Sequence, residues 1–386
     1  MTEVIIAGLG QTPVGEHWDT SLRELAFHAI EAAMQDAGGL RPQALYVGNM
    51  LAPNLSRQAH LGALIADYAG LTGIEAVTVE AAGASGGAAL RQGYLAIASG
   101  MVDVALVVGV EKFTDKQGAE IEEAIATTSD SDFEAVQGMT IAAQAALLMR
   151  RYIHEYAVPR DGFANFALTA HTNGVANKNA MFRKAIKPET YAKAEMVSDP
   201  LNMFDVAPNA DGAAALVLTR RDLLPLNWQN PLVKIAGSAA SSDTLALHDR
   251  KDILYFDTAQ ISAGKAMKQA GIVLDQVNFF EYHDTFSIYA ALQLEAIGFA
   301  IKGKGWKLAA DGEIGLKGRI PCATMGGMKA RGFPGGASGV YQAVEAVTQL
   351  RGRAEANQIA GATYGLVQSL GGPASTAVSH VLQALG

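Results

Sequence analysis

The stretch Gly83-Ala84-Ser85-Gly86 recurs later in the chain as Gly336-Ala337-Ser338-Gly339. Each copy opens a segment that is predicted to be helical. Both segments are nearly uncharged, since Arg91 is the only ion in the first and Glu345 is the only one in the second before its last turn. A helix that is apolar on every side is buried on every side. We therefore expect two buried helices that lie back to back between two sheets.

A second pair of matching segments supports an internal duplication. Ala37-Gly38, with Gln43 before a short apolar run, is echoed by Ala270-Gly271, with Gln276 before a similar run. The two echoes occur in the same order, and an insertion in the glycine- and lysine-rich segment 302–319 accounts for their different spacings. We divide the chain into two similar α/β halves, residues 1–230 and 231–386.

Short apolar runs typical of strands alternate with helical stretches, which indicates an α/β fold with mainly parallel strands. An acidic segment rich in Thr and Ser interrupts this alternation, so residues from about 115 to 200 are predicted to form an inserted loop region. With the duplication, the pattern predicts a five-layer αβαβα sandwich. Strands are expected at 4–7, 44–47, 77–79, 104–108 and 213–218, and helices at 22–37, 61–69, 84–99 and 141–152.

Composition and charge exclude several classes of function. Hydrophobic residues make up 49% of the 386-residue chain and charged residues 18%, which is typical of a globular protein with a large core. The formal net charge of −8 opposes nonspecific binding to nucleic acid or anionic membranes. One cysteine excludes an internal disulfide framework, the histidines form no metal-spaced cluster, and no dinucleotide fingerprint appears, so neither a metal nor a cofactor is predicted. Because no signal peptide or membrane span is visible, we expect a cytoplasmic protein.

Six motifs spread over nearly the whole chain carry a family resemblance: residues 79–87 (VEAAGASGG), 108–112 (VGVEK), 211–215 (DGAAA), 283–286 (HDTF), the glycine-rich run 326–339, and Gly371-Gly372-Pro373. Together they resemble the thiolase superfamily, particularly its archaeal and sterol-carrier-type branch. The resemblance implies the duplicated sandwich, a homodimer or larger assembly, and a covering loop domain at 115–230 that helps to bind coenzyme A (CoA). It also implies an acyl-CoA thioester as substrate or ligand and, for this branch, a small partner protein with an OB-fold and a zinc ribbon.

Gly83 stands where the resemblance places a cysteine that is acylated by the substrate. Exposed backbone N–H groups and the helix dipole at this helix start stabilise a thiolate or an oxyanion. Glycine keeps these donors but provides no nucleophile. A glycine here also permits a tight turn from strand to helix, and an engineered replacement of the cysteine is an open alternative.

One other reactive position of the family is kept and three are changed. His283 keeps the histidine that lies near the thioester oxygen in relatives, and it follows an expected strand. Thr285 stands where many relatives have a proton-shuttling cysteine, Phe333 replaces the histidine of a Gly-His-Pro motif, and Ser369 falls where degradative thiolases place a second cysteine. A phenyl ring neither donates a hydrogen bond nor accepts a proton. The combined changes indicate that selection for Claisen chemistry was relaxed or redirected.

The remaining candidates concern CoA and packing. Tyr282 and Tyr364 flank the expected pocket, and a tyrosine acts as an acid or base in some lyases, although packing is the simpler role for both. Cys322 is the only thiol, and we expect it to be buried and inert. Residues beside the second GASG motif are predicted to bind CoA, with the two cations meeting its phosphates: Lys329, Arg331, Gly332, Gly336 and Ser338.

Two functions fit these residues. The first is a thiolase-family, acyltransferase-like enzyme that binds acyl-CoA or 3-ketoacyl-CoA and makes or breaks a carbon–carbon bond without an acyl-cysteine. A cofactor-free retro-aldolase is one form, because it needs a base and an oxyanion hole but no acyl-enzyme. The second is a non-catalytic subunit that keeps the fold for assembly or acyl-CoA binding within a larger acyltransferase complex. The sequence leaves both open.

Overall fold

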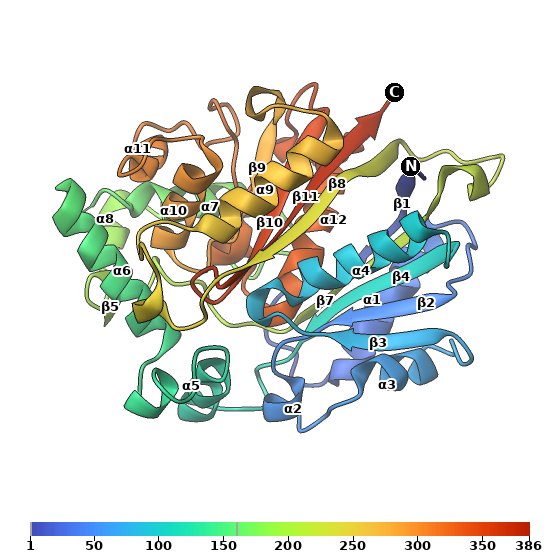
Figure 1. Ribbon diagram of the computed structural model, residues 1–386, viewed down its shortest axis with the longest axis horizontal. Coiled ribbons are helices and arrows are strands. Elements are labelled where there is room, and N and C mark those ends of the chain that lie inside the picture. Colours follow the sequence, from blue (N-terminus) through green and yellow to red (C-terminus); the bar gives the residue numbers. More distant parts are fainter. Residues whose placement is uncertain (1, 160) are drawn as a thin grey trace.

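The computed structural model describes residues 2–159 and 161–386, and its strands repeat one arrangement twice (Figure 1). In each half the strands follow one another from the outer edge of the sheet to the junction between the halves. The first half has β3 (Glu75–Val79), β2 (Ala44–Gly48), β4 (Val104–Glu111), β7 (Gly212–Arg220) and β1 (Val4–Gln11). The second half has β9 (Phe279–Glu281), β10 (Tyr364–Gly371), β11 (Thr376–Leu385) and β8 (Leu232–Ser242).

The two half-sheets share both strand order and direction. β7 and β11 are the last strands of their halves, and each runs antiparallel to both of its neighbours. The second half lacks a full counterpart of β3, but a parallel bridge between Phe280 and Cys322 occupies the same place beside β9. This common topology confirms the predicted duplication.

Helices cover both half-sheets, which gives the five predicted layers. α1 (Leu22–Asp36) packs against β1, β4 and β7, and α3 (Leu61–Tyr68) packs against β2 and β3. On the far side, α9 (Asp257–Ala270) packs against β8 and β11, and α10 (Ser287–Ile297) packs against α9. The middle layer is formed by α4 (Ser85–Ser99) and α12 (Ser338–Leu350), which contact each other and strands of both halves.

The two GASG motifs meet where α4 and α12 begin. A Cβ atom added to Gly86 would lie 2.7 Å from the carbonyl oxygen of Gly336, and one added to Gly339 would lie 2.3 Å from the backbone nitrogen of Gly87. Only glycine allows two backbones to approach this closely. The repeated motif that predicts the duplication is therefore also the contact between its two halves.

Three details differ from the sequence-based expectation. The sheet is mixed rather than mainly parallel, since β1, β7, β8 and β11 each run antiparallel to both of their neighbours. α12 is buried along almost its whole length, but α4 exposes Gln92, Leu95 and Ser99 because it lies beside the outer strand β3. In addition, the two half-sheets are not separate, since β1 pairs with β8 through Ile5 and Lys234. The near absence of charged residues thus predicted the burial of α12 correctly, but it was wrong for one face of α4.

The segment between β4 and β7 holds regular structure rather than a simple loop. It contains α5 (Gly118–Ala126), α6 (Ile141–Tyr156), α7 (Ala164–Gly174), α8 (Pro188–Ala192), β5 (Met196–Ser198) and β6 (Leu201–Asn202). α6 and α7 pack against α10 and against the second half, at the left of Figure 1. The short helices α2 (Ala52–Leu55) and α11 (Gly305–Ala310) complete the fold. In the part of the chain that the structure describes, no helix combines the length and the apolar character needed to cross a membrane.

Candidate functional site

A pocket lies where the turn just before α4, the segment between β4 and β7, and the second half of the chain meet. Four of the five predicted reactive positions line it, namely Gly83, His283, Thr285 and Phe333. Its other walls are mainly apolar and come from α5, α6, α10 and the segment 206–209. The structure therefore brings together residues that are up to 250 positions apart in the sequence.

The imidazole of His283 lies directly against Gly83. A Cβ atom added to Gly83 would be 3.3 Å from Nε2 and 3.0 Å from Cε1 of His283, and 2.7 Å from the carbonyl oxygen of Leu370. Gln293 fixes the backbone of His283, because its Oε1 accepts from the His283 N–H at 2.9 Å and its Nε2 donates to the His283 oxygen at 2.7 Å. Nε2 of His283 therefore faces the space in which a family nucleophile would stand.

Burial keeps His283 neutral. Desolvation, with a smaller contribution from the charge of Arg331, lowers the pKa of His283 to about 3. A neutral imidazole donates through one ring nitrogen and accepts through the other. Such a weakly basic ring suits hydrogen bonding to a carbonyl or enolate oxygen better than proton abstraction.

Phe333 and Thr285 are held by one short stretch of backbone. The Phe333 N–H donates to the carbonyl of Pro208 at 2.9 Å, and the carbonyl of Thr285 accepts from the Ala207 N–H at 2.8 Å. The phenyl ring stands edge-on to His283, with the ring centroids 5.8 Å apart. The same stretch places Asn209, which the sequence did not single out, in the pocket wall.

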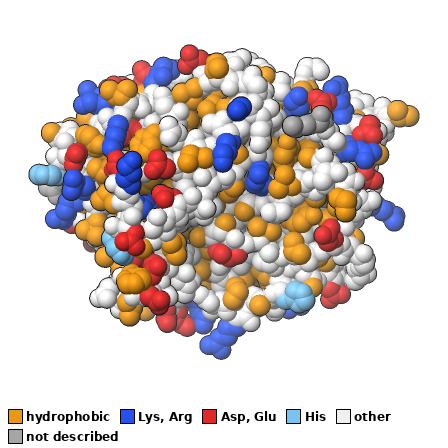
Figure 2. Space-filling model, viewed as in Figure 1, with side chains coloured by type: hydrophobic (Ala, Val, Ile, Leu, Met, Phe, Trp, Pro, Cys, Tyr) orange, Lys and Arg blue, Asp and Glu red, His pale blue; other side chains and the backbone are white. Residues whose placement is uncertain are grey.

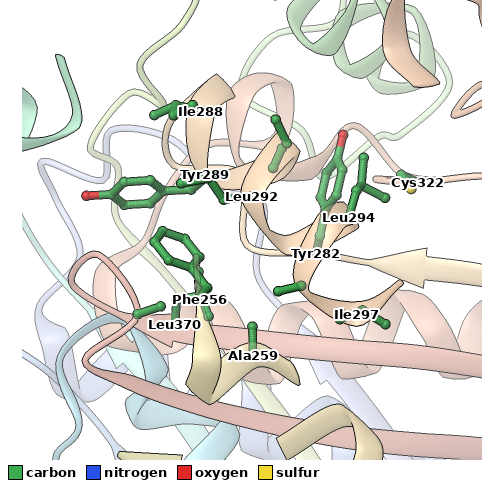
Figure 3. Packing of buried hydrophobic residues seen from close by; sticks show 14 of the residues in the cluster. Phe256, Ala259, Tyr282, Ile288, Tyr289, Leu292, Leu294, Ile297, Cys322 and Leu370 are labelled. Atoms are coloured by element: carbon green, nitrogen blue, oxygen red, sulfur yellow. The ribbon is translucent and has the colours of Figure 1, made fainter. Parts of the chain in front are cut away.

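Tyr289 is the functional candidate that sequence reasoning missed. It lies in the first turn of α10, and Figure 3 shows its hydroxyl pointing away from the hydrophobic residues around it. The hydroxyl is buried in the pocket wall and has no hydrogen-bond partner among the described residues. Nη2 of the neighbouring Arg250, which does not line the pocket, is also buried without a partner among these residues. Burial raises the pKa of Tyr289, and the neighbouring Arg250 charge opposes that rise.

Tyr282 and Tyr364, the two tyrosines that the sequence placed beside the pocket, do not line it. Tyr282 packs near Leu294 and Cys322 (Figure 3), and Tyr364 accepts a hydrogen bond from Gln383 at the start of β10. Cys322 is fully buried, and burial raises the pKa of its thiol well above the usual range. These positions agree with packing roles.

Ser369 also lies outside the pocket, so the structure does not bring it together with the other predicted reactive positions. Its hydroxyl donates to Gln342 Oε1 at 2.9 Å and lies against the start of α4 and α12. Successive residues of a strand face opposite sides, so β10 turns Leu370 toward the pocket and Ser369 toward the helix layer. The motif predicts the strand on which Ser369 lies, whereas the register of β10 decides which side it faces.

The residues predicted to bind CoA are all buried, and none of them lines the pocket. Arg331 Nη1 pairs with Glu345 Oε2 at 2.6 Å, and the Gly336 N–H donates to Glu111 Oε2 at 3.0 Å. Ser338 begins α12, and Gly332 is enclosed by Val14 and Ala210. The structure places these four away from the pocket, because the run 326–339 turns inward beneath α12. Lys329 donates to the carbonyl of Asp205 at 2.6 Å and borders a second cavity, described below.

Glu111 joins the two halves beside the pocket. Its Oε1 accepts from Asn49 Nδ2 at 2.8 Å and from the Leu51 N–H at 3.1 Å, and its Oε2 accepts from the Met50 and Gly336 N–H groups at 2.8 and 3.0 Å. Burial raises the pKa of Glu111 to about 7, although these donors oppose the rise. The folded pKa exceeds the unfolded value of 4.5. Protonation of Glu111 therefore stabilises the folded state, and this contribution to the free energy of unfolding is complete below about pH 4.5 and is lost as the pH rises through 7.

We expect Glu111→Gln to lower the free energy of unfolding by at least about 1–3 kcal/mol. Each carboxylate oxygen of Glu111 accepts hydrogen bonds from two donors. In either orientation of the glutamine side chain, its NH₂ group replaces one of these oxygens and leaves two buried donors without an acceptor. Denaturant unfolding at pH 6 and pH 9 measures both this loss and the pH dependence. Glu123→Gln, at an exposed position of α5, is the control and should change little. Equal stability of the two variants would contradict the role given to Glu111.

Comparison with known proteins decides the family. Residues 4–222 match the thiolase N-terminal domain, and residues 239–384 match the thiolase C-terminal domain-like family. The chain belongs to the thiolase family. It is 42% identical to an acetyl-CoA acetyltransferase of Methanothermobacter thermautotrophicus over 99% of both chains. It is 30% identical to the benzoylsuccinyl-CoA thiolase subunit BbsB of Thauera aromatica, over 92% of this chain and 91% of the relative.

Other thiolase-family relatives have different activities. The chain is 28% identical to a 17-hydroxy-3-oxo-4-pregnene-20-carboxyl-CoA lyase of Mycobacterium tuberculosis over 95% of both chains. Among solved structures, the Ltp2-ChsH2(DUF35) aldolase superposes with a TM-score of 0.84 at 24% identity, over 99% of this chain and 98% of that one. Human mitochondrial 3-ketoacyl-CoA thiolase gives 0.75 at 19% identity, over 100% and 99%. These structural likenesses establish the thiolase fold, and the sequence relatives place the protein in acyl-CoA chemistry.

Proposed function

We propose that this thiolase-family protein forms and breaks a carbon–carbon bond in a CoA thioester without an acyl-enzyme, as a 3-hydroxyacyl-CoA retro-aldolase does. The observation that carries the proposal is the contact between His283 and Gly83. The pocket keeps a hydrogen-bonding imidazole at the helix start, yet none of its described lining residues has a thiol or an amine. The lyase among the relatives also supports carbon–carbon bond cleavage in a CoA thioester.

In the proposed cleavage, the reactive form of Tyr289 is the minor phenolate, which burial disfavours and the neighbouring Arg250 charge favours. This phenolate accepts the proton of the substrate's 3-hydroxyl group. The C2–C3 bond breaks, the C3 oxygen becomes the carbonyl of an aldehyde or ketone, and the bonding electrons form the enolate of the shorter acyl-CoA. His283 donates to the enolate oxygen, as an oxyanion donor does. The proton held by Tyr289 then passes to C2, so no external acid, base or oxidant is consumed. The reverse sequence is an aldol addition.

We place the CoA moiety in a second cavity next to the pocket. Val206 and Ala207 line both spaces, and the second cavity has apolar walls with Lys184 and Lys329 among its lining residues. The adjoining segment 178–193 contains five Lys or Arg residues and one acid, although the whole chain is acidic. This local excess of positive charge fits the phosphates of CoA, and burial lowers the pKa of Lys329 to about 8.

We expect Lys184→Ala to weaken CoA binding by about 10- to 150-fold, because a lost hydrogen bond to a charged group is worth about 1.5–3 kcal/mol. Isothermal titration calorimetry with CoA and with pantetheine measures the effect. The loss of affinity should be confined to CoA, the ligand that carries phosphates. Lys268→Ala, an exposed lysine on α9, is the matched control. An unchanged Kd for CoA would contradict this placement.

We also propose a homodimer that covers the outer edge of β3. Val77 on β3, Leu95 on α4 and Met101 after it are 45%, 41% and 85% exposed, and Figure 2 shows hydrophobic and uncharged side chains over much of this face. An exposed apolar edge strand promotes pairing with another chain. Light scattering at micromolar concentration tests this, and a clean monomer would contradict it. The cytoplasmic location remains a prediction.

A non-catalytic role within a complex is the second candidate. One relative is described as a subunit, and one structural neighbour is an aldolase that contains a DUF35 protein. The two candidates separate in one assay: purified protein is incubated with 3-hydroxybutyryl-CoA, and acetyl-CoA and acetaldehyde are measured. Release of both products in equal amounts supports the lyase. Tight binding without products, alone and with a small OB-fold and zinc-ribbon partner, would favour the subunit.

A further inference from the structure

The stretch 206–210 lies between the pocket and the second cavity, and it brings one polar side chain to the pocket. Val206 and Ala207 line both spaces, Pro208 lines the second cavity, and Asn209 lines the pocket. A CoA thioester that is held in the second cavity, as proposed above, must pass this stretch before its acyl group reaches the pocket. Asn209 is therefore the polar group of this stretch that the thioester meets.

Backbone hydrogen bonds fix the direction of the Asn209 side chain. The Phe333 N–H donates to the Pro208 carbonyl at 2.9 Å, and the Phe333 carbonyl accepts from the Ala210 N–H at 3.1 Å. These two bonds form a parallel bridge between Asn209 and Phe333. Residues paired in this way point to the same face. Because the Phe333 ring lies in the pocket wall against the His283 ring, the Asn209 side chain lies on the pocket side next to it.

The fold does not use the amide group of Asn209. Backbone groups make the hydrogen bonds that hold this stretch, and no hydrogen bond between described residues involves the Asn209 side chain. An amide NH₂ group supplies two donors, whereas the adjacent Phe333 ring supplies none. The amide is therefore free to donate to a ligand that enters the pocket.

We propose that Asn209 is a catalytic residue that donates to the thioester oxygen together with His283, as the second side-chain donor of the oxyanion hole. This assignment rests on the proposed function. Negative charge collects on the thioester oxygen when the enolate forms, and donors that are already in place stabilise it. The amide transfers no proton. The other oxygen within the acyl group, at C3, is the partner of Tyr289 on α10, whereas Asn209 lies on the stretch that the thioester passes.

Deuterium exchange into acetyl-CoA tests which oxygen Asn209 binds, because acetyl-CoA has a thioester oxygen but no oxygen at C3. Asn209→Leu removes the amide at similar volume, and Asn209→Asp keeps the shape but replaces the donors by an acceptor. Both variants should slow the exchange by about 10²–10³-fold, the loss found for one oxyanion donor, and Asn209→Leu should leave the KM for acetyl-CoA nearly unchanged. Asn227→Leu, at an exposed position outside both cavities, is the matched control and should exchange at the wild-type rate.

Infrared spectroscopy of bound acetyl-CoA labelled with ¹³C at the thioester carbon provides a readout that needs no turnover. Hydrogen bonds lower the stretching frequency of a carbonyl, so the band should lie below its value in solution and move back toward that value in Asn209→Leu. The proposal is overturned if Asn209→Asp exchanges at the wild-type rate, if the Asn209 variants slow only the cleavage of 3-hydroxybutyryl-CoA, or if the band moves in Thr285→Val and not in Asn209→Leu. A wild type that shows the band shift without exchange or cleavage would reject the proposed function and leave the assignment of Asn209 standing.

Discussion

Replacing Tyr289 with phenylalanine is expected to slow cleavage of 3-hydroxybutyryl-CoA by about 10²–10⁴-fold, the usual contribution of a general acid or base. The replacement removes only the hydroxyl, so the edge contacts of the ring with Phe256 and Phe286 remain. Because that hydroxyl is buried without a partner, its loss should leave the unfolding free energy equal or slightly higher. Steady-state kinetics and thermal unfolding measure the two effects.

The matched control is Tyr282→Phe, which removes the hydroxyl of another buried tyrosine on the same side of the fold but outside the pocket. Its rate should equal that of the wild type. If Tyr289→Phe retains nearly full activity, proton transfer must use another group, and the mechanism given to this pocket is wrong. Equal losses in the two tyrosine variants would point to packing instead.

Restoring a thiol with Gly83→Cys is expected to leave acetoacetyl-CoA thiolysis far below the usual enzyme rate of roughly 1–10³ per second. The new Cβ would meet the Leu370 carbonyl at 2.7 Å, so backbone must move to admit it. A thiol at this helix start would have a lowered pKa and become acylated. Turnover also needs a base for the cysteine thiol and for the attacking CoA thiol, and Phe333 and Thr285 do not provide one. That deficit is worth about 10²–10⁴-fold.

Thiolysis of acetoacetyl-CoA by Gly83→Cys and by Gly83→Cys with Phe333→His measures this prediction, with Gly83→Ala as the control for added volume. Intact mass after acetyl-CoA treatment reports acylation separately from turnover. The double variant should be faster than the single one. If Gly83→Cys alone reaches the usual rate, His283 and backbone groups suffice, and the view of a redirected site fails.

The fold was predictable because duplication leaves local steric demands in the sequence. Two backbones that touch at Gly86 and Gly339 require glycine in both copies, and this repeated demand can be read without any structure. The exposed face of α4 could not be read in the same way. Uncharged residues indicate that a face tolerates burial, but they do not say what covers it.

A site residue was predictable where a single motif determines its position. It was less predictable where tertiary contacts determine which way the side chain faces. His283, Thr285 and Phe333 line the pocket as expected. Ser369 faces the helix layer instead, because successive residues of a strand face opposite sides and a shift of one residue reverses the outcome. The burial of Arg331 was not predictable, because an arginine beside glycines is typical of a surface turn, whereas the turn 327–331 buries it against Glu345. Tyr289 becomes a candidate only beside Arg250, which is distant in sequence.

The central claim is that this pocket forms an acyl-CoA enolate without an acyl-enzyme. The most direct test is hydrogen exchange at the α-carbon of acetyl-CoA in D₂O, followed by mass spectrometry of both the thioester and the protein. The account predicts deuterium in the acetyl group that depends on Tyr289, together with protein of unmodified mass. A protein that becomes acylated, at Cys322 or elsewhere, while the acetyl group stays free of deuterium would contradict it.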